Sequence, residues 1–289
     1  MNNFQIVLLF LVPFLLLFPT FSFSETDSDS KLDNPDVDLK DFTHPAFVEE
    51  IVIIPQSNQM EYVILDGKWT DDREWKQSGY DGWKFSDGHG IIFRSAHQGN
   101  YLYFLIDFIS DRVPEKNMDR AVICLESNNE KNLIAKDNSH CFIATMKSSN
   151  PVILQGGSPS AIDGNFKRIY HDDVIAVGTV SDFKDRYSQI PHSTYEFKIP
   201  TDLVGRHTEY GLYIAVYDFH NDNLYSWPRN IELENNFQIP SPSKWGVIIS
   251  PDKTLPEFEF PLLLSVLSFS AIIYLSKRKM LNLSFLKYY

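Results

Sequence analysis

The feature that most constrains this chain is a series of short β-type runs separated by turn residues. Between residues 47 and 250, apolar, β-branched and aromatic residues come in short runs, and Gly, Asn, Asp and Pro stand between them. Helical periodicity is almost absent. This pattern predicts one all-β domain, an antiparallel β-sandwich of jelly-roll-like type.

The expected strands follow from the runs themselves. They are 51–54, 62–65, 91–94, 101–108, 120–126, 141–146, 152–154, 166–170, 174–180, 194–199, 211–217 and 245–249. Turn chemistry separates them at 98–100, 156–159, 163–165 and 220–223. A short helical segment is expected at Asp71–Lys76, with Thr70 or Asp71 as its cap and Glu74 closing the capping box.

Two apolar runs lie outside this domain. The first, Phe4–Phe18, is followed by small residues, which predicts a signal peptide over 1–24; an uncleaved N-terminal anchor is the alternative. The second, at 260–276, precedes Lys277-Arg278-Lys279, which predicts a transmembrane helix and a basic cytoplasmic tail over 277–289. A buried core helix is the alternative for the second run. We therefore expect a cell-surface, single-pass membrane protein with an extracellular N-terminal domain.

The segments beside the domain are polar. Residues 25–46 are acidic and rich in Ser and Asp, which is typical of a flexible arm, and 251–259 form a linker to the membrane. The chain has a formal net charge of −12, although the tail after 276 carries four cations. A domain this acidic repels phosphate backbones, so we expect no nucleic-acid partner.

The chain has two cysteines, Cys124 and Cys141, each within an expected strand. Outside the cell an even number of cysteines favours a disulfide. The bridge would join two neighbouring strands across the polar loop between them and would contribute about 3 kcal/mol in the loop-entropy model. Metal binding by two isolated cysteines is the weaker alternative, because no CxxC motif accompanies them.

Two expected strands each have one aliphatic face and one tyrosine-bearing face. In 101–108 the aliphatic face begins at Leu102 and the other at Tyr101; in 212–218 Tyr213 and Tyr217 lie opposite the aliphatic residues. Tyrosines on an open sheet face can stack on sugar rings. The alternative is that they are half-buried residues covering the sheet.

Three stretches resemble one family pattern in their order and spacing. The first is a D-G…E-W stretch at Leu65–Trp75, and the second is an H-x-G-x-x-L-Y-F…D stretch at Phe93–Asp107. The third is an E-x-x-I-P stretch at Tyr195–Pro200, followed by a D…W-P pattern over Gly211–Asp218 and Trp227-Pro228. Together they resemble family-9 carbohydrate-binding modules and the related DOMON-like β-sandwiches. The resemblance implies a non-catalytic module with a saccharide or glycan site on one face or rim.

In sugar-binding members of that family two aromatic rings clamp the saccharide, and calcium commonly supports the loops. The matching rings here would come from Trp69, Trp83 and Trp227, whereas Trp75 has the position of a core residue. The resemblance further implies polar partners and calcium ligands. The polar partners would be Asp66, His97 and Asp218, and the calcium ligands would be Asp66, Asp71, Asp72 and Glu74, whose alternative is a group of solvated acids.

Haem is the other ligand of the DOMON-like relatives, and it would need His or Met as axial donors. His97, Met118, His140 and Met146 are present, but nothing in the sequence pairs them. The sequence has no HExxH, GxSxG or P-loop motif, so we expect a binding module and no enzyme, although composition leaves a pair of glycosidase carboxylates open. A structural or adhesive envelope protein without a small ligand is the other alternative.

The C-terminal segment carries a second resemblance. Pro256-Glu257-Phe258, the apolar run after it and the basic triplet resemble the PEF-type sorting or anchoring tails of archaeal surface proteins. This resemblance implies a membrane anchor and an archaeal source.

Overall fold

A computed structural model describes residues 51–71, 73–159, 165–229, 231, 233, 235, 238–252 and Ser268. The expected signal peptide, acidic arm, membrane helix (Ser268 apart), most of the linker before it and the basic tail lie outside these residues. Within them, no helix combines the length and the apolar character that a membrane crossing needs.

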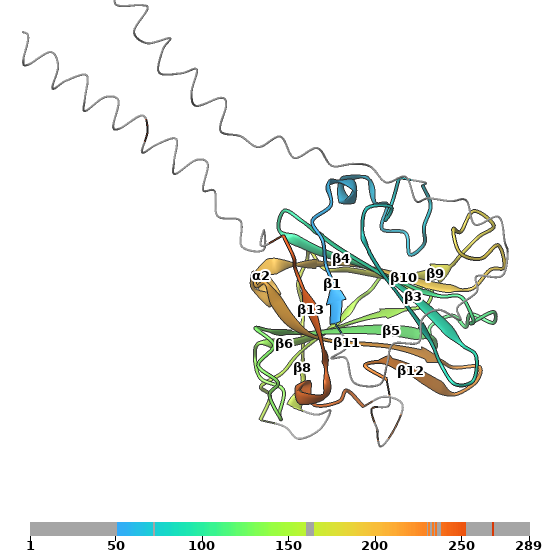
Figure 1. Cartoon of the computed structure of the whole chain (residues 1–289). Helices are drawn as coiled ribbons and strands as arrows, with labels where there is room; N and C mark the ends of the chain where they lie inside the picture. Colours follow the sequence, from blue (N-terminus) through green and yellow to red (C-terminus); the bar gives the residue numbers. More distant parts are fainter. Residues whose placement is uncertain are drawn as a thin grey trace, which may run out of the picture. The chain divides into compact units, whose positions relative to one another are not determined.

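The described residues form two β-sheets, which Figure 1 shows one above the other. The five-stranded sheet has the order β2 (Gly79–Lys84), β3 (Gly90–Gln98), β4 (Tyr101–Phe108), β10 (Ser193–Pro200) and β9 (Ile175–Val180). The eight-stranded sheet has the order β1 (Ile51–Ile53), β13 (Gly246–Ile249), β11 (Glu209–Asp218), β5 (Arg120–Ser127), β6 (Ser139–Thr145), β7 (Val152–Gln155) and β8 (Lys167–Ile169), with β12 (Asn223–Trp227) also paired to β11.

One hydrophobic core fills the space between the sheets. β4 contributes its even-numbered side chains, beginning with Leu102 and Phe104, and β11 contributes Leu212, Ile214 and Val216. These are the aliphatic faces that alternation along each strand predicts. The all-β prediction and the two-layer arrangement are therefore confirmed. The sheets are not purely antiparallel, because β1 pairs with β13 in parallel.

The sequence misses two strands. β2 contains Gly79, Asp81 and Gly82, which have low β propensity, so the segment reads as a turn. Pairing with β3 overrides that propensity. Gly79 is required at this place, because a Cβ there would lie 2.3 Å from the backbone oxygen of Ile53. β12 begins with Asn223 inside the expected turn at 220–223, so the sequence does not mark it as a strand.

The expected strand at 62–65 and the expected helix at 71–76 are wrong. Asn58–Tyr62 form a 3-10 helix (η2), and the described residues from Arg73 to Gln77 form turns. Trp75 has a φ of 55°, a left-handed conformation that no residue of a helix interior adopts. Its indole N–H donates to buried Glu196 at 2.9 Å, so packing against the five-stranded sheet fixes the turn.

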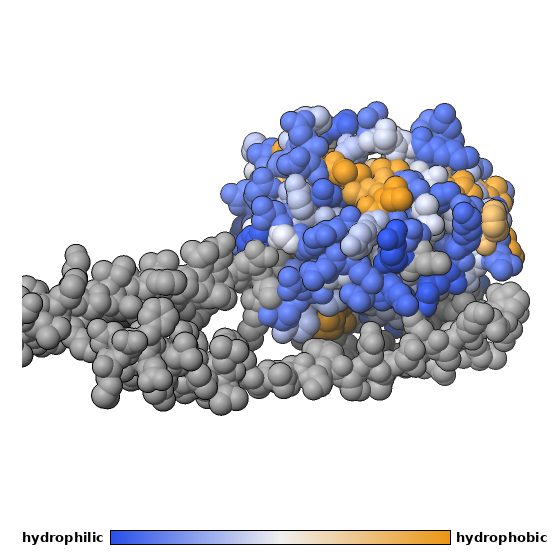
Figure 2. All heavy atoms as spheres, turned by 90° about the horizontal axis from the view of Figure 1, so that it is seen from above, coloured by the Kyte–Doolittle hydropathy of each residue, from blue (hydrophilic) through white to orange (hydrophobic). Residues whose placement is uncertain are grey.

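A segment of chain covers the outer face of each sheet. The segment between β1 and β2 lies above the five-stranded sheet in Figure 1 and packs Met60, Trp69 and Trp75 on Tyr103 and Leu105. Seen from above, this side is mostly hydrophilic, with hydrophobic side chains gathered in patches (Figure 2). On the outer face of the eight-stranded sheet, Ala135, Phe166 and Trp245 from outside the strands pack on Tyr213 and Ala215 of β11.

The disulfide prediction is confirmed. Cys124 on β5 and Cys141 on β6 lie directly opposite each other and are bonded. The bridge belongs to the cluster that covers the eight-stranded sheet. It joins two neighbouring strands, as the hairpin-like sequence between the cysteines indicates.

Two short helices complete the described structure. α2 (Thr201–Val204) follows β10 directly, and η4 (Pro242–Lys244) precedes β13. α2 ends at Gly205, whose φ of 71° suits glycine.

Candidate functional site

The three tryptophans predicted to clamp a sugar are buried. Trp83 and Trp227 are 6% and 3% exposed and stack on each other at 5.4 Å within the core between the sheets. Trp69 belongs to the covering segment and packs onto the five-stranded sheet, where its indole N–H donates to the backbone oxygen of Asp71. The expectation of exposed rings is wrong, because β2 is a paired strand that turns Trp83 inward. Trp75 is a core residue, as its position predicts.

The tyrosines of β11 do not form an open platform. Tyr213 is 1% exposed and packs on Trp245, and Tyr217 is 4% exposed and donates its hydroxyl hydrogen bond to Asp222. Asp218 accepts hydrogen bonds from the backbone and side-chain amide groups of Asn221, so it organises the β11–β12 turn. These side chains stabilise the sheet and its turn, and they do not form a common binding surface.

The predicted calcium ligands that the structure describes all accept hydrogen bonds from protein N–H or O–H groups. Glu74 accepts from the backbone N–H groups of Ile64, Thr70 and Asp71. Asp71 forms a two-point contact with the Arg73 guanidinium, which holds the pKa of Asp71 down at about 2. Asp66 accepts from the Lys68 N–H and the Thr70 hydroxyl. Asp72 lies outside the described residues. Calcium binding here stays a prediction.

Of the residues considered for haem, His140 near the start of β6 and Met146 just after its end are not brought together as an axial pair. His140 and Met146 are six residues apart along this part of the chain, or about 20 Å at the rise of a strand. His97 is buried, and its Nε2 lies 3.2 Å from each carboxylate oxygen of Asp252. Met118 is 37% exposed. Haem binding therefore stays a prediction for which no pair of axial ligands has been identified among the described residues.

An open pocket of about 330 Å³ lies at one rim of the five-stranded sheet. It is lined where the β3–β4 hairpin meets the start of α2, by Asn100, Tyr101, Asp173, Pro200, Thr201, Asp202 and Arg206. Its walls combine one aromatic ring with a guanidinium group, an amide and two carboxylates. Pockets that hold small ligands range from about 300 Å³ upward, so this one suits a ligand of sugar size.

Backbone contacts fix the walls of this pocket. The β3–β4 loop has two residues, with Gln98 paired to Tyr101, and the positive φ of Gly99 meets the need of a tight hairpin turn. The N–H of Thr201 donates to the backbone oxygen of Asn100 at 2.8 Å, which joins the hairpin turn to α2. This bond holds the hairpin turn and the start of α2 together at the pocket.

Arg206 is the main polar group of the pocket. Its Nη2 donates to the backbone oxygen of Gly99 at 3.0 Å and to the side-chain oxygen of Asn100. Its Nη1 is buried and has no hydrogen-bond partner among the described residues. A buried guanidinium N–H without a partner costs free energy.

The aromatic wall is Tyr101, which is half-buried. The ammonium group of Lys198 lies 3.9 Å from the centre of its ring and covers one face. Asp202 faces His171 at 3.4 Å across the same rim. Two carboxylates against one guanidinium give the lining residues a net negative charge, so the pocket disfavours an anionic ligand.

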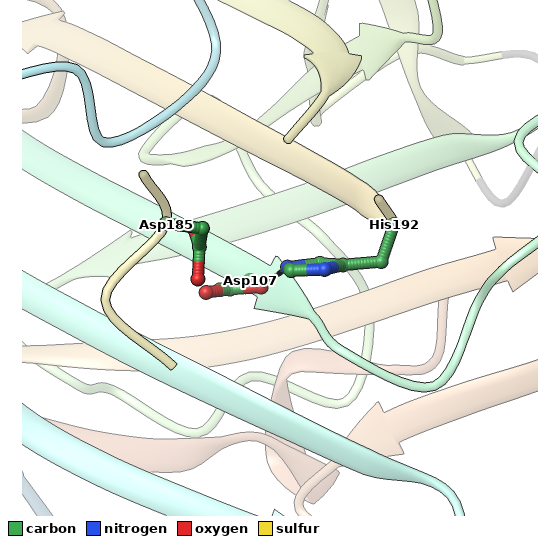
Figure 3. Close-up of side chains that lie close together, drawn as sticks. All are labelled: Asp107, Asp185 and His192. Atoms are coloured by element: carbon green, nitrogen blue, oxygen red, sulfur yellow. Dashed lines mark hydrogen bonds and ion pairs between the residues drawn. The ribbon is translucent and has the colours of Figure 1, made fainter. Parts of the chain in front are cut away.

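A second polar cluster lies on the outer face of the five-stranded sheet, at the far end of β4. Asp185 and His192 point toward Asp107 from opposite sides (Figure 3), and all three residues are buried. His192 Nε2 lies 2.5 Å from Asp107 Oδ1. One ligand atom from each of the three residues lies within 4.8 Å of the other two.

The charges of this cluster are coupled. Burial alone would lower the pKa of His192, but the charge and hydrogen bond of Asp107 raise it to about 9. Burial and the charge of Asp107 raise the pKa of Asp185 to about 7. At neutral pH a protonated His192 is therefore paired with Asp107, and Asp185 lies near its titration point.

Sequence reasoning misses the pocket residues. Asn100, Tyr101 and the end of β10 lie in stretches quoted for the family resemblance, but Asp173, Asp202 and Arg206 carry no motif. The one sequence signal that could have located the pocket is the Gly99-Asn100 turn, because a hairpin turn places its flanking residues at the rim of a sheet. The buried Asp107 is the final Asp of the H-x-G-x-x-L-Y-F…D stretch.

Comparison with known proteins gives limited similarity. No family model matches the chain, and no curated protein matches it. Among solved structures, a carbohydrate-binding module of family 9 from Caldicellulosiruptor kristjanssonii in complex with glucose matches with a TM-score of 0.43 and 13% identity over 70% of this chain and 95% of that chain. The same type of module from that organism in complex with cellotriose gives 0.42 and 12% over 70% and 93%. Neither the fold nor the function argued for this chain rests on these similarities.

Proposed function

We propose that this chain is a non-catalytic binding module for a neutral saccharide and that the rim pocket holds the sugar. The single observation that carries the proposal is the rim pocket itself, whose lining combines the Arg206 guanidinium with a tyrosine ring and two carboxylates. The family resemblance of the sequence implies the same ligand class, with its site on one face or rim.

The chemistry of the pocket matches a polyol. Sugar hydroxyls both donate and accept, so they need a donor such as Arg206 together with acceptors such as Asp173 and Asp202. The C–H face of a sugar ring packs on an aromatic ring, and Tyr101 has one face away from Lys198 for that contact. Because both walls are fixed by backbone contacts, little free energy is spent on ordering them.

We further propose, from the sequence, that the module acts at the cell surface on a C-terminal membrane helix. The apolar run at 260–276 and the basic triplet after it support this proposal. Fractionation of cells that make the full chain tests it. Recovery in the soluble cytosolic fraction with reduced cysteines would contradict it.

A structural or adhesive role without a small ligand is the second candidate. The burial of Tyr213, Trp83 and Trp227 favours it, since the predicted open aromatic platform is missing. Under this alternative Arg206 braces the hairpin turn and binds nothing else.

Titration calorimetry of the full chain in detergent against neutral hexoses, pentoses and β-linked oligosaccharides, with and without Ca²⁺, separates the two candidates. We expect micromolar to millimolar binding that Arg206→Met and Tyr101→Ala each weaken at least tenfold. Arg73→Met and Tyr62→Ala are the matched controls, because both side chains are exposed on the covering segment. Absence of binding at 10 mM sugar (about 2.7 kcal/mol of affinity) would favour the structural role.

A further inference from the structure

We propose that Asp107, Asp185, His192 and Thr194 form a binding site for a divalent transition-metal ion. The site lies on β4, on β10 and in the loop between β9 and β10. It is independent of the proposed sugar pocket, because Asp107 and Tyr101 are six residues apart on β4, or about 20 Å.

The first observation is the convergence of three buried side chains from separate parts of the chain. Asp107, Asp185 and His192 bring two carboxylates and an imidazole together within 4.8 Å. Among the described residues, no other three His, Cys, Asp or Glu side chains come this close. An ion between them would replace the proton that now links His192 to Asp107.

The second observation is a buried hydroxyl without a partner. Thr194 is 1% exposed, and its Oγ1 has no hydrogen-bond partner among the described residues. The antiparallel register places Thr194 directly opposite Asp107, so both side chains stand on the same face of the sheet, about 5 Å apart at Cβ. Buried hydroxyls without partners are rare and costly, and a metal ion beside Asp107 would supply the missing contact.

The third observation is the orientation of the imidazole. His192 Nδ1 lies 2.7 Å from the backbone oxygen of Ile190, which can only accept, so Nδ1 carries a hydrogen. Nε2 is then the nitrogen that faces Asp107 and Asp185. A histidine whose Nδ1–H is held by a carbonyl while Nε2 is directed into a carboxylate group has the arrangement of a metal ligand with its supporting contact.

The ligand set selects the class of metal. An imidazole nitrogen suits Zn²⁺ better than Mn²⁺, Ca²⁺ or Mg²⁺, which prefer oxygen ligands. Two carboxylates and a neutral imidazole balance the charge of a divalent ion. Bound metal would tie the 181–192 loop to β4 and hold Tyr187, whose hydroxyl accepts a hydrogen bond from Arg94, in place over the sheet.

The experiment uses the full chain after treatment with a chelator, titrated by calorimetry with Zn²⁺, Mn²⁺ and Ca²⁺, with Co²⁺ absorption as an independent readout. We expect one Zn²⁺ per chain and visible Co²⁺ bands. Asp185→Asn and His192→Gln should weaken Zn²⁺ binding at least tenfold, and Thr194→Val several-fold. Asp182→Asn, in the same loop and paired with Lys68, is the matched control and should leave binding unchanged.

Asp185→Asn and Thr194→Val keep the shape of the side chain, so they decide the question even where His192→Gln fails to fold. No Zn²⁺ binding at 0.1 mM metal would overturn the proposal. Zn²⁺ binding that survives Asp185→Asn and Thr194→Val would also overturn it, because surface histidines would then hold the metal. A preference for Ca²⁺ over Zn²⁺ would overturn the assignment to transition metals.

Discussion

His140 makes the stability of this domain depend on pH. Its side chain is buried on β6 beside Phe142, and its Nδ1 has no hydrogen-bond partner among the described residues. Burial lowers the pKa of His140 from 6.5 to about 4, and the charge of Asp137 opposes this shift only in part. The folded protein therefore holds His140 neutral over a range in which the unfolded chain binds a proton.

The sign follows from proton uptake. Between pH 6.5 and 4 the unfolded state binds more protons at His140 than the folded state, so stability falls as the pH falls through this range. At pH 4.5 the wild-type chain loses about 2.5 kcal/mol from this residue, since each unit of pKa difference is worth 1.36 kcal/mol. Well above pH 6.5 His140 is neutral in both the folded and the unfolded state, so its protonation no longer affects stability.

The variant His140→Leu isolates this effect, because leucine has a similar volume and no charge. At pH 7 we expect the variant to equal or exceed the wild type in the free energy of unfolding, since it removes a buried polar atom without a partner. At pH 4.5 we expect it to exceed the wild type by about 2.5 kcal/mol more. Other acidic groups shift both proteins alike, so they cancel in the difference.

Urea unfolding followed by tryptophan fluorescence, at half-unit steps from pH 4 to 8, measures the difference. His220→Leu is the matched control for exchanging a histidine for leucine, because His220 is exposed in the β11–β12 turn. A difference between His140→Leu and the wild type that stays constant across this range would refute the reasoning.

Three further predictions concern the disulfide, the core and the pocket. Replacing Cys124 and Cys141 together by alanine should lower the free energy of unfolding by about 3 kcal/mol, measured in urea, whereas the wild type with reductant should match the variant. Gly246→Ala should destabilise by about 1–3 kcal/mol, since its Cβ would lie 2.3 Å from the Trp227 ring, and an unchanged melting temperature would contradict this packing. Arg206→Met should reduce saccharide affinity at least tenfold in calorimetry without changing the melting temperature by more than about 2 °C, and full affinity would remove Arg206 from the site.

The alternation of apolar and polar residues predicted strand positions correctly where the strands are long and the alternation is strong. The bounds of β4 match the expected strand at 101–108, and its inward residues are those that alternation selects. Strands β5 and β10 differ from expectation only at their ends. In these segments burial of one face and β propensity act in the same direction, so the local signal is sufficient.

Prediction failed where a tertiary contact overrides local preference. β2 exists because β3 pairs with it, and Trp75 adopts a left-handed conformation because Glu196 and the covering cluster hold its ring. The prediction of an open aromatic platform was wrong for the same reason. Whether a tyrosine-bearing face is exposed depends on whether another segment of the chain packs over it, and the sequence of the strand alone does not specify that segment.

The sequence by itself determined the all-β class, the disulfide partners and the inward face of the main strands, because each depends on residue type and on the two-residue period of a strand. Only the tertiary structure decided that both outer sheet faces are covered, that the pocket lies at the β3–β4 rim, and that Asp107 meets Asp185 and His192. The contacts of His192 with Asp107 and of Arg206 with Gly99 join residues 85 and 107 positions apart. Such long-range contacts are set by how the strands pair and the sheets pack, which no local pattern specifies.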